Sequence, residues 1–148
     1  MDITYRFGHD VPLQSILNLY QATTLGERRP VEDAARMIAM ITNSNLVVSA
    51  WVDAQLVGLA RTLTDFTFVG YMADLLVHED HQRRGIGTRL IEETRNRMGA
   101  RSKLVLLSLD SSDAYYRRIG FTELNGAWLL RATDPFPIVK QGQEKQVG

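Results

Sequence analysis

Apolar residues recur along the chain with two different periods, and these periods predict its helices and strands. Helical spacing with one apolar face occurs in three longer segments and one short one: 11–20, 34–41, 86–98 and 111–119. Short β-rich runs predict five strands: 3–7, 46–52, 56–63, 66–77 and 103–109. A closing hairpin is predicted over 121–131, around the Asn125-Gly126 pair.

The order of these elements predicts an α+β fold of the three-layer α/β/α type. Tight links join the three strands between residues 46 and 77, so they are expected to form an antiparallel meander. The helix 86–98 lies between two strands, and such a crossover implies that 66–77 and 103–109 run parallel. We therefore expect a mixed, mostly antiparallel sheet in one domain, 1–133. The tail, 134–148, is expected to be flexible because it has little to bury.

Composition removes several classes of function. Lys+Arg and Asp+Glu both total 17, so the net charge of zero argues against nucleic-acid or anionic-membrane binding. The absence of cysteine excludes disulfides, thiolate metal sites and a cysteine nucleophile. His78 and His81 lie three residues apart without further ligands, so we expect no metal site. No run approaches the ~20 apolar residues that span a bilayer, and we expect a soluble, cytoplasmic protein.

The heptapeptide Gln82-Arg83-Arg84-Gly85-Ile86-Gly87-Thr88 lies between a predicted strand and a predicted helix. Its glycines let the backbone approach a ligand, and the first helical turn offers unpaired N–H groups at the positive end of the helix dipole. This combination can bind a diphosphate. It is not a P-loop, because no Gly-Lys follows, nor a dinucleotide motif, because Leu90 stands where a third glycine is needed. A solvated helix start remains the alternative for the heptapeptide alone.

The heptapeptide resembles the Gln/Arg-x-x-Gly-x-Gly/Ala motif of the GNAT superfamily of acyl-CoA-dependent N-acetyltransferases. The preceding "DLLVHEDH" resembles the fourth strand of that family, and "AYYRRIGF" (114–121) resembles its tyrosine-containing helix followed by Gly-Phe. The order of elements is similar to the GNAT fold over residues 2–131. The resemblance implies an enzyme that transfers an acetyl group from acetyl-CoA to a primary amine of a small molecule or peptide. Direct attack in a ternary complex is the simpler mechanism, since no cysteine is available for a thioester intermediate.

The resemblance also implies where coenzyme A binds. Strands four and five would splay apart, and the backbone of the fourth strand would pair with the pantetheine arm through Leu75, Leu76 and Val77. The diphosphate would be bound by main-chain N–H groups and some side chains of Gln82, Arg83, Arg84, Gly85, Ile86, Gly87 and Thr88. A main-chain N–H near Leu76 would polarise the acetyl oxygen. The family often has an asparagine before the last helix, but Leu109, Asp110 and Ser111 occupy that region here. That contact is then absent or made by a serine.

Two catalytic groups are needed. Tyr116 matches the general acid of the family, and a phenol is protonated at neutral pH, as a donor must be. A base must deprotonate the amine, and Asp74 on the fourth strand is the first candidate. Its alternation with Ala73 and Leu75 fits a buried structural carboxylate equally well. His78, Glu79 and a chain of water molecules are further candidates for the base.

The acceptor is expected to lie against residues 23–30 and 124–127. Glu27 would attract a cationic amine, whereas Arg28 and Arg29 would attract an acidic group, and a solvated loop is the third interpretation. A non-catalytic coenzyme A sensor and a protein-interaction module on the same fold are the alternatives to an enzyme. An interaction module would expose Trp128, which we instead expect in the core. Monomer and homodimer both remain open.

Overall fold

A computed structural model describes residues 2–109 and 112–137, and the chain divides into two compact units whose boundary in the sequence falls between Asp113 and Ala114. The strands are β1 (Thr4–Phe7), β2 (Leu46–Val52), β3 (Gln55–Thr64), β4 (Val69–Val77) and β5 (Lys103–Leu106). The helices are α1 (Leu13–Gln21), η1 (Thr24–Arg28), α2 (Ala34–Thr42), η2 (Glu79–His81), α3 (Ile86–Arg97) and α4 (Asp113–Arg118), where η1 and η2 are 3-10 helices.

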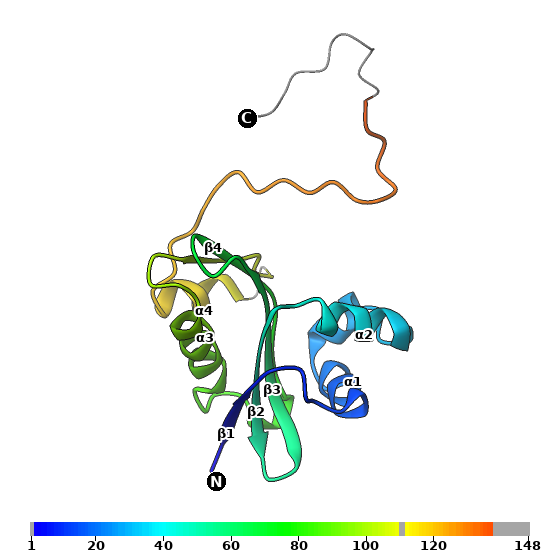
Figure 1. Ribbon diagram of the computed structural model, residues 1–148, viewed down its shortest axis with the longest axis vertical. Coiled ribbons are helices and arrows are strands. Elements are labelled where there is room, and N and C mark those ends of the chain that lie inside the picture. The colour runs from blue at the N-terminus through cyan, green and yellow to red at the C-terminus, as the bar shows by residue number, and fades with distance from the viewer. Residues whose placement is uncertain (1, 110–111, 138–148) are drawn as a thin grey trace. The chain divides into compact units, whose positions relative to one another are not determined.

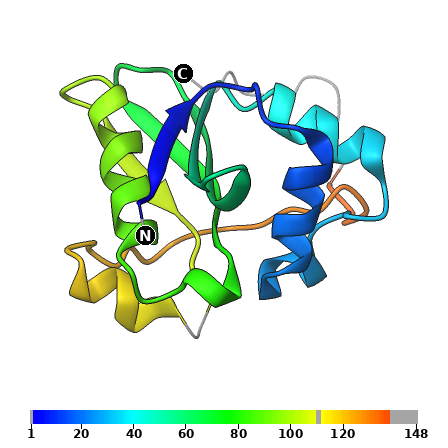
Figure 2. The same ribbon diagram turned by 90° about the horizontal axis from the view of Figure 1, so that it is seen from below.

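The first unit is a three-layer structure around a five-stranded sheet in the order β1-β2-β3-β4-β5. Neighbouring strands are antiparallel except for β4 and β5, which are parallel because α3 crosses over between them. Helices α1 and α2 cover one face of the sheet and α3 covers the other (Figures 1 and 2). The predicted α+β fold with one parallel pair of strands is therefore confirmed.

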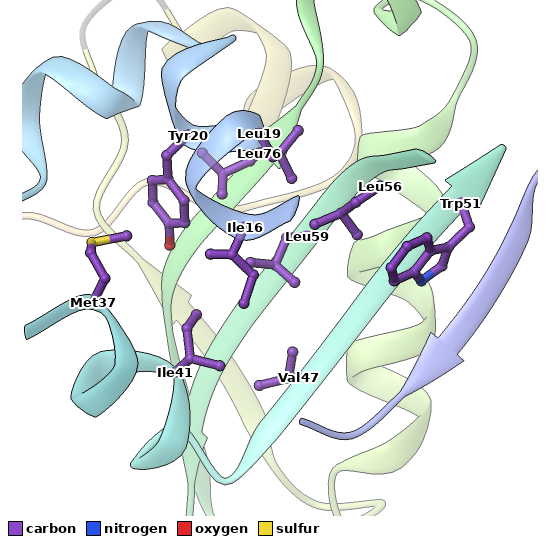
Figure 3. Close-up of a cluster of buried hydrophobic side chains, with 10 residues drawn as sticks. All are labelled: Ile16, Leu19, Tyr20, Met37, Ile41, Val47, Trp51, Leu56, Leu59 and Leu76. Carbon is purple, nitrogen blue, oxygen red and sulfur yellow. The ribbon is translucent and has the colours of Figure 1, made fainter. Parts of the chain in front are cut away.

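The main core fills the space between the sheet and helices α1 and α2 (Figure 3). Leu19 and Met37 of the two helices are buried against Leu59 and Leu76 of β3 and β4. Side chains of this size each contribute about 1.5–3 kcal/mol on burial. The same packing fixes α1 and α2, and hence the η1 connection between them, relative to β4.

On the opposite face, Gly58 of β3 sets the approach of α3. A Cβ atom at this position would lie 2.9 Å from Cγ2 of Ile86 and 3.0 Å from Cδ1 of Leu90. The first turns of α3 therefore pack almost directly on the backbone of β3. This contact holds the start of α3, and the heptapeptide that leads into it, beside the end of β4.

Strands β4 and β5 separate halfway along β4. They pair only from Val69↔Lys103 to Met72↔Leu106, and β4 then continues to Val77 with no further partner on that side within the described residues. On its other side β4 pairs with β3, where Asp74 faces Arg61 but Met72 faces the adjacent Thr62. Ala73 is thus the extra residue of a β-bulge, which bends the bulged strand. The predicted splay is confirmed, and it begins at this bulge.

The second unit departs from the sequence prediction. The predicted hairpin over 121–131 is wrong, because this segment contains no strand, and Trp128 is 95% exposed, not part of the core. A two-stranded hairpin needs an apolar surface to pack on, and on its own it is at best marginally stable. Helix α4 has no buried residue to supply one. The predicted roles of Asp110 and Ser111, and most of the predicted tail, lie outside the described residues.

Candidate functional site

The bend between β4 and α3 places two residues in the left-handed backbone region. Arg83 has φ 65° and Gly85, the residue before the first turn of α3, has φ 77°. No atom lies within 4 Å of a Cβ built on Gly85, so its backbone angle, and not crowding, favours glycine there. When residues in the left-handed region alternate with residues in the right-handed region, successive backbone N–H groups point toward one spot. Such an arrangement forms a concavity that can bind an anion.

The start of α3 adds to this surface. The N–H of Arg89 donates to the carbonyl of Gly85 at 3.0 Å as the helix begins, so the N–H groups of Ile86 and Gly87 precede the first turn that closes on itself. They lie at the positive end of the helix dipole. Gln82, Arg83, Arg84 and Gly85 are all exposed, and the buried Ile86 anchors the turn beneath them. The seven residues predicted to bind a diphosphate therefore lie in one bend, whose first four residues are accessible, and their binding of a diphosphate stays a prediction.

Side-chain contacts tie this bend to the end of β4. Nε2 of Gln82 donates to the carbonyl of Val77 at 3.4 Å, and Nδ1 of His78 accepts a 3.1 Å hydrogen bond from the N–H of Asp80. His78 and His81 are in edge-to-face contact. Across residues 2–109 and 112–137, no three His, Cys, Asp or Glu side chains group in a way that could hold a metal ion. Over the same residues no helix has the length and apolarity to cross a bilayer.

The backbone register identifies which groups of β4 face the open edge. The N–H of His78 donates to the carbonyl of Val57 at 2.8 Å. In an antiparallel pair every second residue bonds to the partner strand, so Leu76 and Asp74 also face β3. The backbone groups of Leu75 and Val77 then point to the side that β5 has left. The amides on the free edge near Leu76 are therefore those of its two neighbours, and the predicted contact of this segment with the acetyl oxygen stays a prediction.

Asp74 lies on the buried side of the same segment, and its side chain is fully enclosed. Its Oδ2 accepts hydrogen bonds from the Tyr20 hydroxyl at 2.5 Å and from Nε of Arg61 at 2.9 Å. Its Oδ1 accepts from Nε of Arg29 at 2.8 Å, with Nη2 of Arg29 2.6 Å away. The carboxylate joins α1, the η1 connection, β3 and β4. These contacts fit the structural alternative, because both carboxylate oxygens already accept hydrogen bonds from side chains of other elements.

Sequence reasoning missed the partners of Asp74. Burial raises the pKa of Tyr20, and the adjacent Asp74 carboxylate raises it further, so the hydroxyl is a permanent donor. The pairing of Arg61 with Asp74 depends on the register of β3 against β4, which shifts at the bulge of Ala73 and cannot be predicted from the strand bounds alone. The contacts of Tyr20 and Arg29 with Asp74 depend on how α1 and η1 pack on the sheet.

Tyr116 lies in the second unit, in α4. Its ring is in edge-to-face contact with Tyr115 at 5.2 Å and with Phe121 at 5.4 Å between centroids. Burial, and then the neighbouring Tyr115, raise the pKa of Tyr116 to about 12. The phenol is therefore protonated across the physiological range, as a proton donor must be. The 124–127 segment of this unit is exposed and has no regular structure.

Comparison with known proteins agrees with this geometry. The family described as "Acetyltransferase (GNAT) domain" matches residues 18–129, more than half of the chain. No curated protein matches the chain significantly.

Several solved structures have the same fold. A GNAT family acetyltransferase from Streptococcus pneumoniae is 23% identical, with a TM-score of 0.67 over 88% of this chain and 99% of its own. A ribosomal-protein-alanine N-acetyltransferase from Brucella melitensis is 18% identical, with a TM-score of 0.67 over 88% of this chain and 99% of its own. An N-acetyltransferase from Thermoplasma acidophilum, solved in complex with coenzyme A, is 16% identical, with a TM-score of 0.65 over 86% of this chain and 94% of its own.

The family match extends over the bend before α3, the bulged β4 strand, the separation of β4 from β5 and the tyrosine of α4. The chain belongs to the GNAT family of acetyltransferases.

Proposed function

We propose that this protein is an N-acetyltransferase that transfers the acetyl group of acetyl-CoA to a primary amine, by direct attack in a ternary complex. One observation carries the proposal: an anion-binding bend and an unpaired strand edge lie at the same end of β4. A ligand with a diphosphate at one end and an amide-rich arm at the other matches both features. Family membership supplies the reaction class.

The residues of the bend fit the diphosphate of coenzyme A. The backbone N–H groups at the start of α3 would donate to its oxygens, and the exposed Arg83 and Arg84 side chains would add positive charge. The edge of β4 at Leu75 and Val77 fits the amide groups of the pantetheine arm, as in the addition of a strand to a sheet. The residues of this site are Leu75, Leu76, Val77, Gln82, Arg83, Arg84, Gly85, Ile86, Gly87 and Thr88. When bound, acetyl-CoA supplies an acyl group activated as a thioester.

The protein would contribute three functions to the reaction: polarising the acetyl group, protonating the leaving group and positioning the reacting segments. A backbone N–H at the open edge of β4, from Leu75 or Val77, would polarise the acetyl oxygen. Tyr116 would donate its phenolic proton to the departing thiolate. Asp74 is assigned a positioning role, because its oxygens are already held by Tyr20, Arg29 and Arg61.

The remaining candidates for the base differ in their hydrogen bonding. Nδ1 of His78 accepts from a backbone N–H, so in the neutral ring Nε2 carries the proton and has no lone pair to offer. This argues against His78 as the base. Glu79 is exposed at the start of η2, and it or solvent water would accept the proton from the amine.

The proposal is tested by incubating the full chain with acetyl-CoA and a panel of amino acids, polyamines, aminoglycosides, arylalkylamines and lysine peptides. Free thiol is followed by a chromogenic reagent, and the acetylated product by mass spectrometry. We expect thiol release that depends on the amine. Cofactor binding measured by calorimetry, without thiol release over the whole panel, would favour the non-catalytic sensor. A sensor would need the bend but not Tyr116.

A further inference from the structure

The cluster around Asp74 carries an uncompensated positive charge. Two guanidinium groups, those of Arg29 and Arg61, contact this one carboxylate, which leaves a net charge of one positive unit. Tyr20 adds no charge, since its hydroxyl is protonated. Among the described residues no other acidic side chain forms an ion pair with either arginine. The side chain of Arg61 is only 11% exposed, so part of this charge lies away from water.

Arg29 is the more accessible of the two arginines. Its side chain is 25% exposed, and it follows η1, the connection between α1 and α2. Its Nη2 donates to the carbonyl of Ala73 at 3.2 Å, and its Nη1 donates to the carbonyl of Arg28 at 2.9 Å. Each Nη atom carries two N–H bonds. One N–H of Nη1 therefore has no partner within the described part of the chain.

The contact with Ala73 places this guanidinium at the bulge where β4 leaves β5. Under the proposed function the acetyl group and the attacking amine meet beside the open edge that begins there. Arg29 is thus a fixed cation next to the reaction centre, oriented by the Asp74 carboxylate and by two backbone carbonyls. A guanidinium held in this way is preorganised to bind an anion, because few of its rotamers remain to be frozen.

The neighbours of Arg29 do not offer the same arrangement. Arg28 and Glu27 are exposed, and neither side chain forms a hydrogen bond or ion pair with a described residue. They fit the solvated loop that was one of the interpretations of this segment. Only Arg29 combines a fixed orientation, partial burial and an excess of positive charge.

We propose that Arg29 selects the acceptor: the amine substrate carries an anionic group, a carboxylate or a phosphate, that binds the guanidinium of Arg29. This inference rests on the proposed function and deepens it. An anion placed there would neutralise the cluster and accept charge-assisted hydrogen bonds, which contribute about 1.5–3 kcal/mol each, or roughly 10–100-fold in affinity. The substrate class is that of amino acids and phosphorylated amines, in contrast to polyamines.

The experiment compares acceptors that differ only in the anionic group. One arm pairs amino acids of increasing chain length with their amides, and the other pairs phosphoethanolamine with ethanolamine. The kcat/KM ratio within each pair is measured for the wild type, Arg29→Gln, Arg29→Lys and the control Arg28→Gln. The two amines of a pair differ in intrinsic reactivity, but this difference is the same for every variant. Comparing the ratio of the wild type with that of a variant therefore isolates the effect of the side chain. Acceptor binding in the presence of coenzyme A is measured in parallel by calorimetry.

In at least one of the two arms, we expect the wild type and Arg28→Gln to have a higher kcat/KM for the anionic acceptor than for its neutral partner. In Arg29→Gln this ratio of kcat/KM values is expected to fall by about 10–100-fold. Arg29→Lys retains a charge beside Asp74, so it is expected to stay folded and keep part of the preference. The inference is overturned if the wild type prefers the neutral acceptors. It is also overturned if Arg29→Gln prefers the anionic acceptors as strongly as the wild type does. If no acceptor releases thiol but calorimetry shows the Arg29-dependent preference, the proposed chemistry fails and the anion site stands.

Discussion

The hydroxyl of Tyr20 lies 2.5 Å from Oδ2 of Asp74, so a residue near the end of α1 is joined to the middle of β4 across 54 positions of sequence. Both side chains are buried, and two arginines complete the contacts of the carboxylate. This connection fixes the η1 segment beside the bulge of β4. Its loss is expected to affect the whole first unit.

Asp74→Asn is therefore expected to lower the free energy of unfolding by about 3–5 kcal/mol, because it leaves two partly buried guanidinium groups without a counter-charge. The measurement is denaturant unfolding followed by circular dichroism. Glu93→Gln is the matched control, since it also removes a carboxylate 2.8 Å from an arginine, but from the exposed Arg89. The control should change stability much less, and equal losses would contradict the structural role of Asp74.

The same variant tests whether Asp74 is the base. Asp74→Asn is expected to keep a measurable kcat per folded molecule and the same shape of the pH–kcat profile. An essential base that titrates would give the profile an acid limb, and this limb would vanish on its removal. Disappearance of the limb in Asp74→Asn alone would return Asp74 to the catalytic role.

Gly85→Ala is expected to destabilise the protein by about 1 kcal/mol, because an alanine pays a steric cost at φ 77°. Gly85→Asn is the matched control, since asparagine tolerates this backbone region better. We expect thermal unfolding to rank the proteins as wild type, Asn and then Ala. Coenzyme A affinity by calorimetry should follow the same order, and an unaffected affinity in Gly85→Ala would show that the bend does not bind the cofactor.

Gly87→Glu should separate stability from binding. Replacing a helical glycine, and placing a carboxylate in the first turn of α3, favour the helix. The same carboxylate would repel a diphosphate, and loss of two charge-assisted hydrogen bonds corresponds to at least about 100-fold in affinity. We thus expect an unchanged or higher melting temperature with coenzyme A affinity lowered by that factor. Gly87→Gln, of similar size and neutral, should retain more of the affinity, and equal losses would point to bulk, not charge.

Tyr116→Phe is expected to lower kcat by about 10²–10⁴-fold with little change in the dissociation constant for acetyl-CoA. Tyr115→Phe, one residue away, is the control and should have a small effect. The pKa of Tyr116 is raised to about 12, so the acid is lost only as pH rises through that value. Below about pH 11 no alkaline fall in kcat should come from this residue. Unaltered turnover in Tyr116→Phe would remove it from the mechanism.

A run of β-rich residues predicted β2 over residues 46–52, the same bounds that the structure gives, and helical spacing of apolar residues placed α3 to within one residue. These elements bury one consistent set of side chains, so local pattern and tertiary packing agree. The bulge at Ala73 could not be predicted, because it is visible only in the register of β3 against β4. The Asn125-Gly126 pair misled the prediction, because a turn sequence alone does not stabilise a hairpin, which needs an apolar surface to pack on.

In the candidate site, the bend was predicted well because glycine and helix-start chemistry are local. The contact of the η1 connection with β4 was not predicted, since nothing near Arg29 in the sequence indicates that it pairs with a buried carboxylate 45 positions later. The choice between Leu76 and its neighbours likewise depended on one hydrogen bond, from His78 to Val57. Residues that act through long-range register are those that sequence reasoning is least able to find.

The open edge of β4 also bears on aggregation. An unpaired strand edge is a template on which another chain can add a strand and begin aggregation. Here the bulge at Ala73 interrupts the regular spacing, and the side chains of Arg29 and Gln82 already bond to the carbonyls of Ala73 and Val77. Within the described residues, this leaves the backbone groups of Leu75 and the N–H of Val77 free on this edge. The template that β4 offers to a strand of another chain is therefore short, while a slender ligand needs no more than this length.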